Sequence, residues 1–226
     1  MPINLTNPNQ RTPCVLVLDA STSMETATST GKTRIEELNA GIQSLREAIR
    51  ADDSAYSRVS LSVVMVGGPR SEAALLMDWT DAADFEAFKM RSGGATPLGA
   101  GMLLALQLVE QAKVDLKAAG ISYTRPWIIV ISDGEPTDER HIWSQAVTEM
   151  QKAEQDRKAE VFVIGVQGAD LGTLGKLSQR PALALEGVRF KELFVWLSDS
   201  LSAASRSRPG ENIQLPSADP WRNVGM

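Results

Sequence analysis

Residues 14–23 read Cys-Val-Leu-Val-Leu-Asp-Ala-Ser-Thr-Ser, an apolar run that ends in one carboxylate and two serine hydroxyls. An unbroken apolar run is typical of a strand buried on both faces, as in a parallel sheet covered by helices. Ligands of open α/β sheets bind beyond the carboxyl ends of such strands. This stretch therefore predicts both the fold class and a polar site that begins at Asp19.

Further apolar runs predict the rest of the sheet. We expect three more buried strands, at Val59–Gly67, Trp127–Ser132 and Val161–Val166. Leu75–Trp79 is expected to be a short antiparallel edge strand after a Gly-Gly-Pro turn, and Pro181–Leu185 is a less regular sixth segment. Apolar residues spaced by three and four predict helices between the strands, at 33–50, 98–119, 139–157 and 191–204. The fold class is therefore α/β: a doubly wound, mostly parallel six-stranded sheet with one antiparallel edge strand and helices on both faces.

The length and composition fit one such domain. The chain has 226 residues, of which 43% are hydrophobic and 23% are charged. We expect an N-terminal arm at 1–11, one domain at 12–205 and an extended tail at 206–226. The tail is polar and broken by prolines, yet it carries Ile213, Leu215 and Trp221, which are costly to leave in water. Docking of the tail and simple disorder both remain open.

Composition also excludes several classes of protein. The only cysteine, Cys14, lies inside an apolar run, which indicates a buried, inert thiol. No stretch approaches the roughly 18 to 20 apolar residues of a membrane span, and no secretory signal opens the chain, so we expect a cytoplasmic protein that binds no membrane. The net charge of −5, with basic residues scattered among acids, argues against a nucleic-acid partner.

The polar residues at the strand ends form the candidate site. The first predicted strand, Cys14–Asp19, ends in Asp19, and Ser21 and Ser23 come directly beyond it. Asp133 follows a later strand in a Ser-Asp-Gly sequence. Thr96 stands in the glycine-rich loop between them, before Pro97 and a helix, so it is a plausible N-cap with Pro97 in the first helical turn. Glu135 and Asp138 lie beside Asp133, where they either enrich the acidic rim or cap the following helix.

Two carboxylates and three hydroxyls make an all-oxygen site. Hard cations prefer such ligands, so we expect Mg²⁺, or else Mn²⁺ or Ca²⁺, with water in the remaining positions. Because only two of the five groups are charged, the bound ion would keep net positive character. It can then attract an Asp or Glu side chain of a protein partner.

These residues also carry a family resemblance. Asp19-x-Ser21-x-Ser23, the Thr96 loop and Asp133 in Ser-Asp-Gly resemble the three-part metal-ion-dependent adhesion site of von Willebrand factor A domains. The resemblance covers roughly residues 12 to 205. It implies that Ser21, Ser23 and Thr96 bind the metal directly or through water, while Asp19 and Asp133 often hold the ion through water.

A finer resemblance rests on two short stretches of sequence. Val-Leu-Asp-Ala-Ser-Thr-Ser-Met at 17–24 and Ile-Ser-Asp-Gly-Glu-Pro-Thr-Asp at 131–138 look like bacterial TerY-type proteins. Those proteins are encoded near tellurite-resistance genes, in a stress-response setting with kinase-like and phosphatase-like partners. The resemblance implies partners of those two kinds.

An enzymatic function fits the same residues less well than a binding function does. Gly31-Lys32-Thr33 suggests a P-loop nucleotide hydrolase, but Thr26 stands where that loop needs a glycine to let its amides wrap the phosphates. An aspartyl phosphatase would want an acid at position 21, which is serine, and the only histidine, His141, is expected at the surface. We therefore predict a binding module and no enzyme. A scaffold whose metal is purely structural remains the other alternative.

Overall fold

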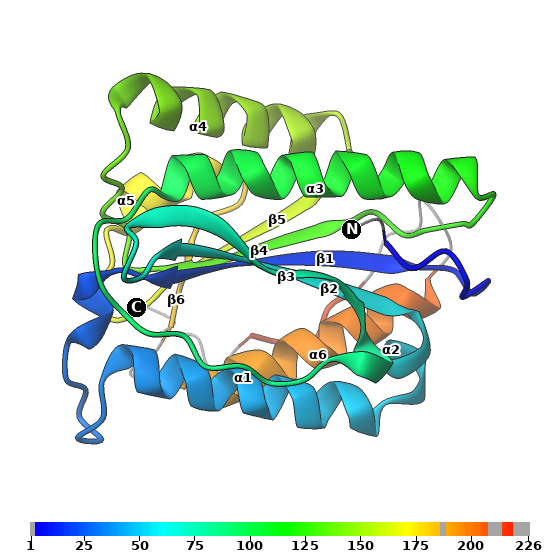
Figure 1. Ribbon diagram of the computed structural model, residues 1–226, viewed down its shortest axis with the longest axis horizontal. Coiled ribbons are helices and arrows are strands. Elements are labelled where there is room, and N and C mark those ends of the chain that lie inside the picture. The colour runs from blue at the N-terminus through cyan, green and yellow to red at the C-terminus, as the bar shows by residue number, and fades with distance from the viewer. Residues whose placement is uncertain (1–2, 186–188, 208–213, 219–226) are drawn as a thin grey trace.

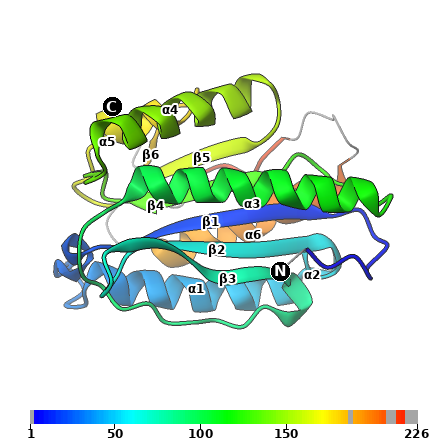
Figure 2. The same cartoon turned by 45° about the horizontal axis from the view of Figure 1, so that its top comes forward.

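The computed structural model describes residues 3–185, 189–207 and 214–218, which form a central sheet covered by helices (Figure 1). The six strands are β1 (Thr12–Ala20), β2 (Val59–Gly67), β3 (Glu72–Asp81), β4 (Trp127–Ser132), β5 (Glu160–Gly165) and β6 (Leu183–Ala184). Their order in the sheet is β3-β2-β1-β4-β5-β6, as Figure 2 shows. Only β3 runs antiparallel to its neighbour. The predicted fold class is therefore confirmed.

The described part of the chain has six α-helices, of which five lie between strands and the sixth follows the last strand. They are α1 (Arg34–Ala51), α2 (Asp53–Arg58), α3 (Leu98–Ala118), α4 (Arg140–Gln155), α5 (Leu171–Leu174) and α6 (Phe190–Arg206). Helices α3 and α4 cover one face of the sheet, and α1 and α6 cover the other (Figure 1). Short 3-10 turns follow β1 and β3, at Thr22–Glu25 (η1) and Ala82–Asp84 (η2), and a third follows α5.

Alternation along β1 builds a separate core on each face. Leu16 and Leu18 point toward the layer of α1 and α6, whereas Val15 and Val17 point toward α3 and α4. All four side chains are fully buried, as a central strand covered on both faces requires. Cys14 is buried in the same strand, and burial strongly raises the pKa of its thiol, so it carries no nucleophile.

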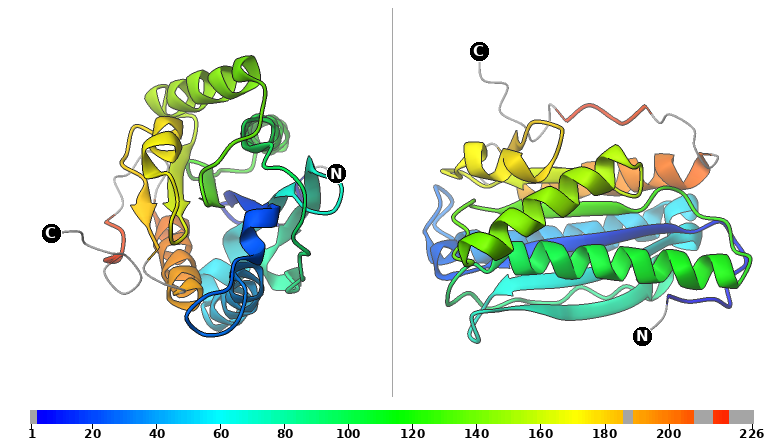
Figure 3. Two further views of the ribbon diagram at one scale, coloured as in Figure 1. Left: turned by 90° about the vertical axis from the view of Figure 1, so that its left-hand side faces the viewer. Right: turned by 90° about the horizontal axis from the view of Figure 1, so that it is seen from above.

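The sheet order places the candidate site. The chain leaves β1 to form β2 on one side, and the later β4 pairs with β1 on the other side, so a topological switch point lies between β1 and β4. At such a point the loops beyond the carboxyl ends diverge and leave a crevice for a ligand. The left view of Figure 3 looks onto this edge of the molecule.

Residues flanking the domain pack onto it where they are described. Ile3 is buried against Ala112 and Leu116 of α3, and the Asn4 amide donates to Asp81. None of the helices in the described ranges has both the length and the apolar character that crossing a bilayer would require.

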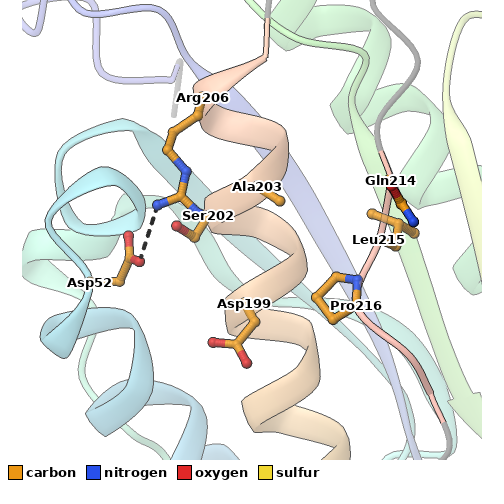
Figure 4. A pocket seen from close by; sticks show the side chains of 8 residues that line it. All are labelled: Asp52, Asp199, Ser202, Ala203, Arg206, Gln214, Leu215 and Pro216. Atoms are coloured by element: carbon orange, nitrogen blue, oxygen red, sulfur yellow. Dashed lines mark ion pairs between the residues drawn. The ribbon is translucent and has the colours of Figure 1, made fainter.

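The described piece of the tail lies along α6. The indole Nε1 of Trp196 donates to the Pro216 carbonyl at 2.9 Å, and Leu215 packs against the core. Leu215 and Pro216 close one side of a pocket whose other wall includes Asp199 and the ion pair of Arg206 with Asp52 (Figure 4). Ile213 and Trp221, which like Leu215 are costly to leave in water, lie outside the described residues.

Candidate metal site

The end of β1 supplies a preorganised carboxylate and two hydroxyls. Asp19 accepts the amide N–H of Ser21 through Oδ1 at 2.8 Å and the hydroxyl of Ser132 through Oδ2 at 2.6 Å. The hydroxyls of Ser21 and Ser23 lie 2.9 Å apart. The fixed carboxylate therefore stands beside a pair of hydroxyls at the end of β1.

The Thr96 loop is bonded to the loops on both sides of it. The Thr96 amide donates to the Thr137 hydroxyl, and the Thr137 amide donates to the Thr96 carbonyl, both at 2.9 Å. On the other side, the Thr22 amide and hydroxyl both donate to the Gly94 carbonyl. The loops after β1, before α3 and after β4 are thus held together by main-chain bonds, and Thr96 is buried between them.

Gly67 makes this close approach possible. It ends β2 with a φ of +90°, a conformation that suits glycine. A Cβ added there would meet the Ala95 carbonyl oxygen and the Ser21 nitrogen, each at 2.8 Å. A side chain at this position would push the loop carrying Thr96 away from the loop carrying Ser21.

Asp133 brings the second carboxylate, and one of its oxygens is unusual. Oδ1 is buried and accepts no hydrogen bond from any described residue. Oδ2 lies 3.7 Å from Nη1 of Arg34, the first residue of α1. A buried carboxylate oxygen without a donor is costly, so this atom is suited to a cation.

The electrostatics of Asp19 point the same way. Burial raises the pKa of Asp19, and the nearby negative charge of Asp133 raises that pKa further. The hydrogen bonds from Ser132 and Ser21 act in the opposite direction, because they favour the ionised form. A divalent cation would neutralise both carboxylates and so remove the cost of holding two negative charges close together in a buried place.

The donor set therefore fits a hard divalent cation. Within the described ranges, no group of three or more His, Cys, Asp or Glu side chains gathers as in a carboxylate-rich or thiolate-rich metal centre. A cation at this edge would thus depend on hydroxyl oxygens as well as on Asp19 and Asp133. Ions that accept neutral oxygens and keep water, such as Mg²⁺ and Mn²⁺, suit such ligands.

Two expectations about helix caps are wrong. Helix α3 begins at Leu98, so Pro97 occupies the cap position and Thr96 precedes it. In the first turn of α3, the amides of Gly99 and Ala100 instead donate to the two carboxylate oxygens of Asp138, at 2.8 and 2.9 Å. Asp138 therefore caps α3, not the helix that follows it, because the loop after β4 folds back over the start of α3.

We expect Asp138→Ala to lower the free energy of unfolding by about 0.5–2 kcal/mol, as loss of a helix cap does. The matched control is Glu139→Ala, since the neighbouring Glu139 side chain makes no capping bond to α4. Urea unfolding followed by circular dichroism measures both variants. Equal stability of the two would contradict the capping role of Asp138.

The Gly31-Lys32-Thr33 segment is built as a helix start. The Thr33 amide donates to Oε2 of Glu36 at 2.8 Å, and the Glu36 amide donates to the Thr33 hydroxyl at 3.3 Å, which is a capping box. The amides of Gly31 and Arg34 donate to the carbonyls of Thr28 and Thr26. These amides are occupied, whereas a P-loop turns its free amides toward the phosphates.

Sequence reasoning missed two residues of the site. Ser132 stands out in the sequence only as part of Ser-Asp-Gly, yet its hydroxyl fixes the Asp19 carboxylate. The sequence pattern predicts no role for Arg34, although it lies against Asp133. Its position in the first turn of a helix is a signal that could have been noticed, because a cation there opposes the helix dipole.

Comparison with known proteins supports the α/β fold described above. The sequence model of the von Willebrand factor type A domain family matches residues 14–194. A search of curated proteins found no match. The structure is similar to a pilus adhesin, SpaC from Lactobacillus rhamnosus GG in an open conformation, with a TM-score of 0.65 and 15% identity over 86% of this chain and 30% of that one.

Two further solved structures have the same fold at similar distance. The VWA domain of SpRpn10 gives a TM-score of 0.53 at 11% identity, with 81% of this chain and 93% of that one covered. Proximal thread matrix protein 1 from the mussel byssus gives 0.54 at 14% identity, with 86% and 48% covered. The chain spans under a third of the adhesin and about half of the byssus protein.

Proposed function

Because the chain belongs to the von Willebrand factor type A domain family, we propose that it is a metal-dependent protein-binding module. Domains of this family generally bind other proteins and are generally not enzymes. In this proposal Asp19, Ser21, Ser23, Thr96 and Asp133 hold Mg²⁺, or else Mn²⁺ or Ca²⁺. The ion supplies a Lewis-acidic position that an Asp or Glu of the partner completes.

The observation that carries the proposal is the buried Oδ1 of Asp133, which accepts no hydrogen bond from the described residues. It stands at the same edge as the Asp19 carboxylate and the paired hydroxyls of Ser21 and Ser23. The two negative charges of Asp19 and Asp133 balance the two positive charges of a divalent ion. No net negative charge then remains to repel an incoming carboxylate. A charge-assisted contact at a partly dry edge is stronger than the same contact in open water.

Affinity capture from the native cell tests the proposal. We expect a partner to be retained in Mg²⁺ and released by EDTA, while the circular dichroism spectrum stays unchanged because the two cores do not depend on the ion. A captured partner with the same affinity in Mg²⁺ and in EDTA would contradict it. The ion would then have only a structural role, tying the three loops together.

The resemblance to TerY-type proteins extends the proposal to particular partners. It favours kinase-like and phosphatase-like proteins of a tellurite-resistance or stress-response system as the first candidates for the capture experiment. Direct binding assays with acidic surface variants of such a partner would identify the side chain that reaches the ion.

We expect no ATP hydrolysis, because the amides of the Gly31-Lys32-Thr33 segment are occupied and Lys32 is exposed in a turn. Phosphate release and the shift of the melting temperature by Mg-ATP are the measurements. Turnover that disappears in Lys32→Ala would revive the nucleotide-hydrolase reading. Turnover that persists in that variant would be assigned to contamination and checked with a second preparation.

A further inference from the structure

Arg34 places a fixed positive charge in the candidate metal site. Its Nη2 donates to the Gln167 carbonyl at 2.6 Å, and its Nη1 donates to the Ser23 carbonyl at 3.4 Å. The same Nη1 lies 3.7 Å from Oδ2 of Asp133. One guanidinium therefore touches the loop after β1, the loop after β4 and the loop after β5.

The helix that carries Arg34 does not explain its charge. Arg34 is the first residue of α1, where the positive end of the helix dipole disfavours a cation. The capping box of Thr33 and Glu36 already satisfies this helix start, and Glu36 and Glu37 complement the dipole. Nothing in the start of α1 requires an arginine, so the reason for it lies in what the guanidinium faces.

The guanidinium also retains capacity for a further ligand. Two hydrogen bonds and one longer ion pair engage at most three of its five N–H groups. The side chain is 17% exposed, so it is held by the loops without being sealed from solvent. Among cationic side chains, arginine is the one whose planar fork matches a carboxylate.

We propose that Arg34 is the second cationic group of the acidic-ligand site. This inference rests on the proposed function, since it concerns the same ligand. Arg34 lowers the affinity of the site for the bare metal ion by charge repulsion, and it raises the affinity of the metal-loaded site for a carboxylate. The site is thereby tuned to hold the ion most firmly when the acidic partner is also bound.

The alternative is that Arg34 is a latch that only holds the three loops in place. The two roles predict opposite signs. A latch, when removed, loosens Ser23 and Asp133 and weakens metal binding. A repelling charge, when removed, strengthens metal binding, by roughly three- to tenfold even with the full screening of bulk water for unit charges several ångströms apart.

Titration with Mn²⁺ alone, followed by electron paramagnetic resonance, separates these roles. We compare the wild type with Arg34→Gln, which removes the charge, and Arg34→Lys, which keeps it. Arg46→Gln is the matched control, because Arg46 is on the same helix and pairs with Glu86 away from the site. Acetate is the carboxylate probe, and broadening of its methyl resonance by bound Mn²⁺ reports its affinity for the loaded protein.

We expect Arg34→Gln to bind Mn²⁺ several-fold more tightly and acetate several-fold more weakly than the wild type. Arg34→Lys should match the wild type for Mn²⁺ and fall between the two for acetate, and Arg46→Gln should change neither. Weaker or unchanged Mn²⁺ binding in Arg34→Gln would overturn the inference while the metal site itself stands. A wild type that binds no Mn²⁺ would overturn the proposed function and this inference together.

Discussion

Replacing Asp19 and Asp133 together by asparagine is expected to abolish specific Mn²⁺ binding. The double variant Asp19→Asn/Asp133→Asn removes both charges of the proposed ligand set and leaves the side-chain shapes nearly unchanged. We expect the affinity to fall by more than about 100-fold, since losing even an outer partner of a metal ligand costs roughly 10–100-fold. Water-proton relaxation or electron paramagnetic resonance measures the bound fraction of Mn²⁺.

The fold of this variant should survive. Burial disfavours the ionised form of Asp19, so the asparagine replaces a charge that the metal-free protein holds at a cost. We therefore expect a melting temperature without metal that is equal to or above that of the wild type. In the wild type, Mn²⁺ should raise the melting temperature, and in the double variant it should not.

Two exposed acids provide a matched control for the lost charge. Glu25 and Glu135 each lie two residues beyond a proposed ligand, Ser23 and Asp133, and both are exposed. Glu25→Gln/Glu135→Gln removes the same net charge from the same edge without touching the five proposed ligands. Equal losses of Mn²⁺ affinity in the two double variants would mean that the edge attracts cations only through its overall charge.

The sheet could be predicted from the sequence because strands that are buried on both faces need continuous runs of apolar residues. Strands β1, β2, β4 and β5 are Val-, Ile- and Leu-rich runs, and each lies within two residues of its predicted start. The antiparallel β3 is longer than expected, at Glu72–Asp81, since a half-exposed edge strand has no continuous apolar run to mark its ends. Helix α2 escaped prediction because it is a single short turn held by the Asp52 cap.

The site could be predicted only in part, and the reason is physical. Asp19 is the last residue but one of β1 and Asp133 directly follows β4, so the topology of a parallel sheet brings them to one edge. Arg34, Ser132 and Asp138 act through contacts with residues 39 to 133 positions away in the chain, and no spacing rule encodes such contacts. Their roles depend on how loops fold against each other after the sheet has formed.

Thr96→Val is expected to weaken binding of a captured partner by about tenfold, which corresponds to roughly 1.4 kcal/mol. The change removes one hydroxyl, keeps the shape of the side chain and alters no charge. Because the Thr96 amide and carbonyl bond to Thr137, the main chain of the loop should stay in place. The loss would then come from the ligand set of the ion and from nothing larger.

The serine variant separates the hydroxyl from the methyl group. Thr96→Ser keeps the hydroxyl and should bind the partner nearly as well as the wild type, whereas EDTA should reduce both to the level of a protein without metal. Surface plasmon resonance with the purified partner, in Mg²⁺ and in EDTA, measures all three proteins. If Thr96→Val and the wild type bind equally well in Mg²⁺ and are equally insensitive to EDTA, the interface lies on another face. The oxygens at the edge of β1 and β4 would then hold an ion whose only role is to fasten the loops around it.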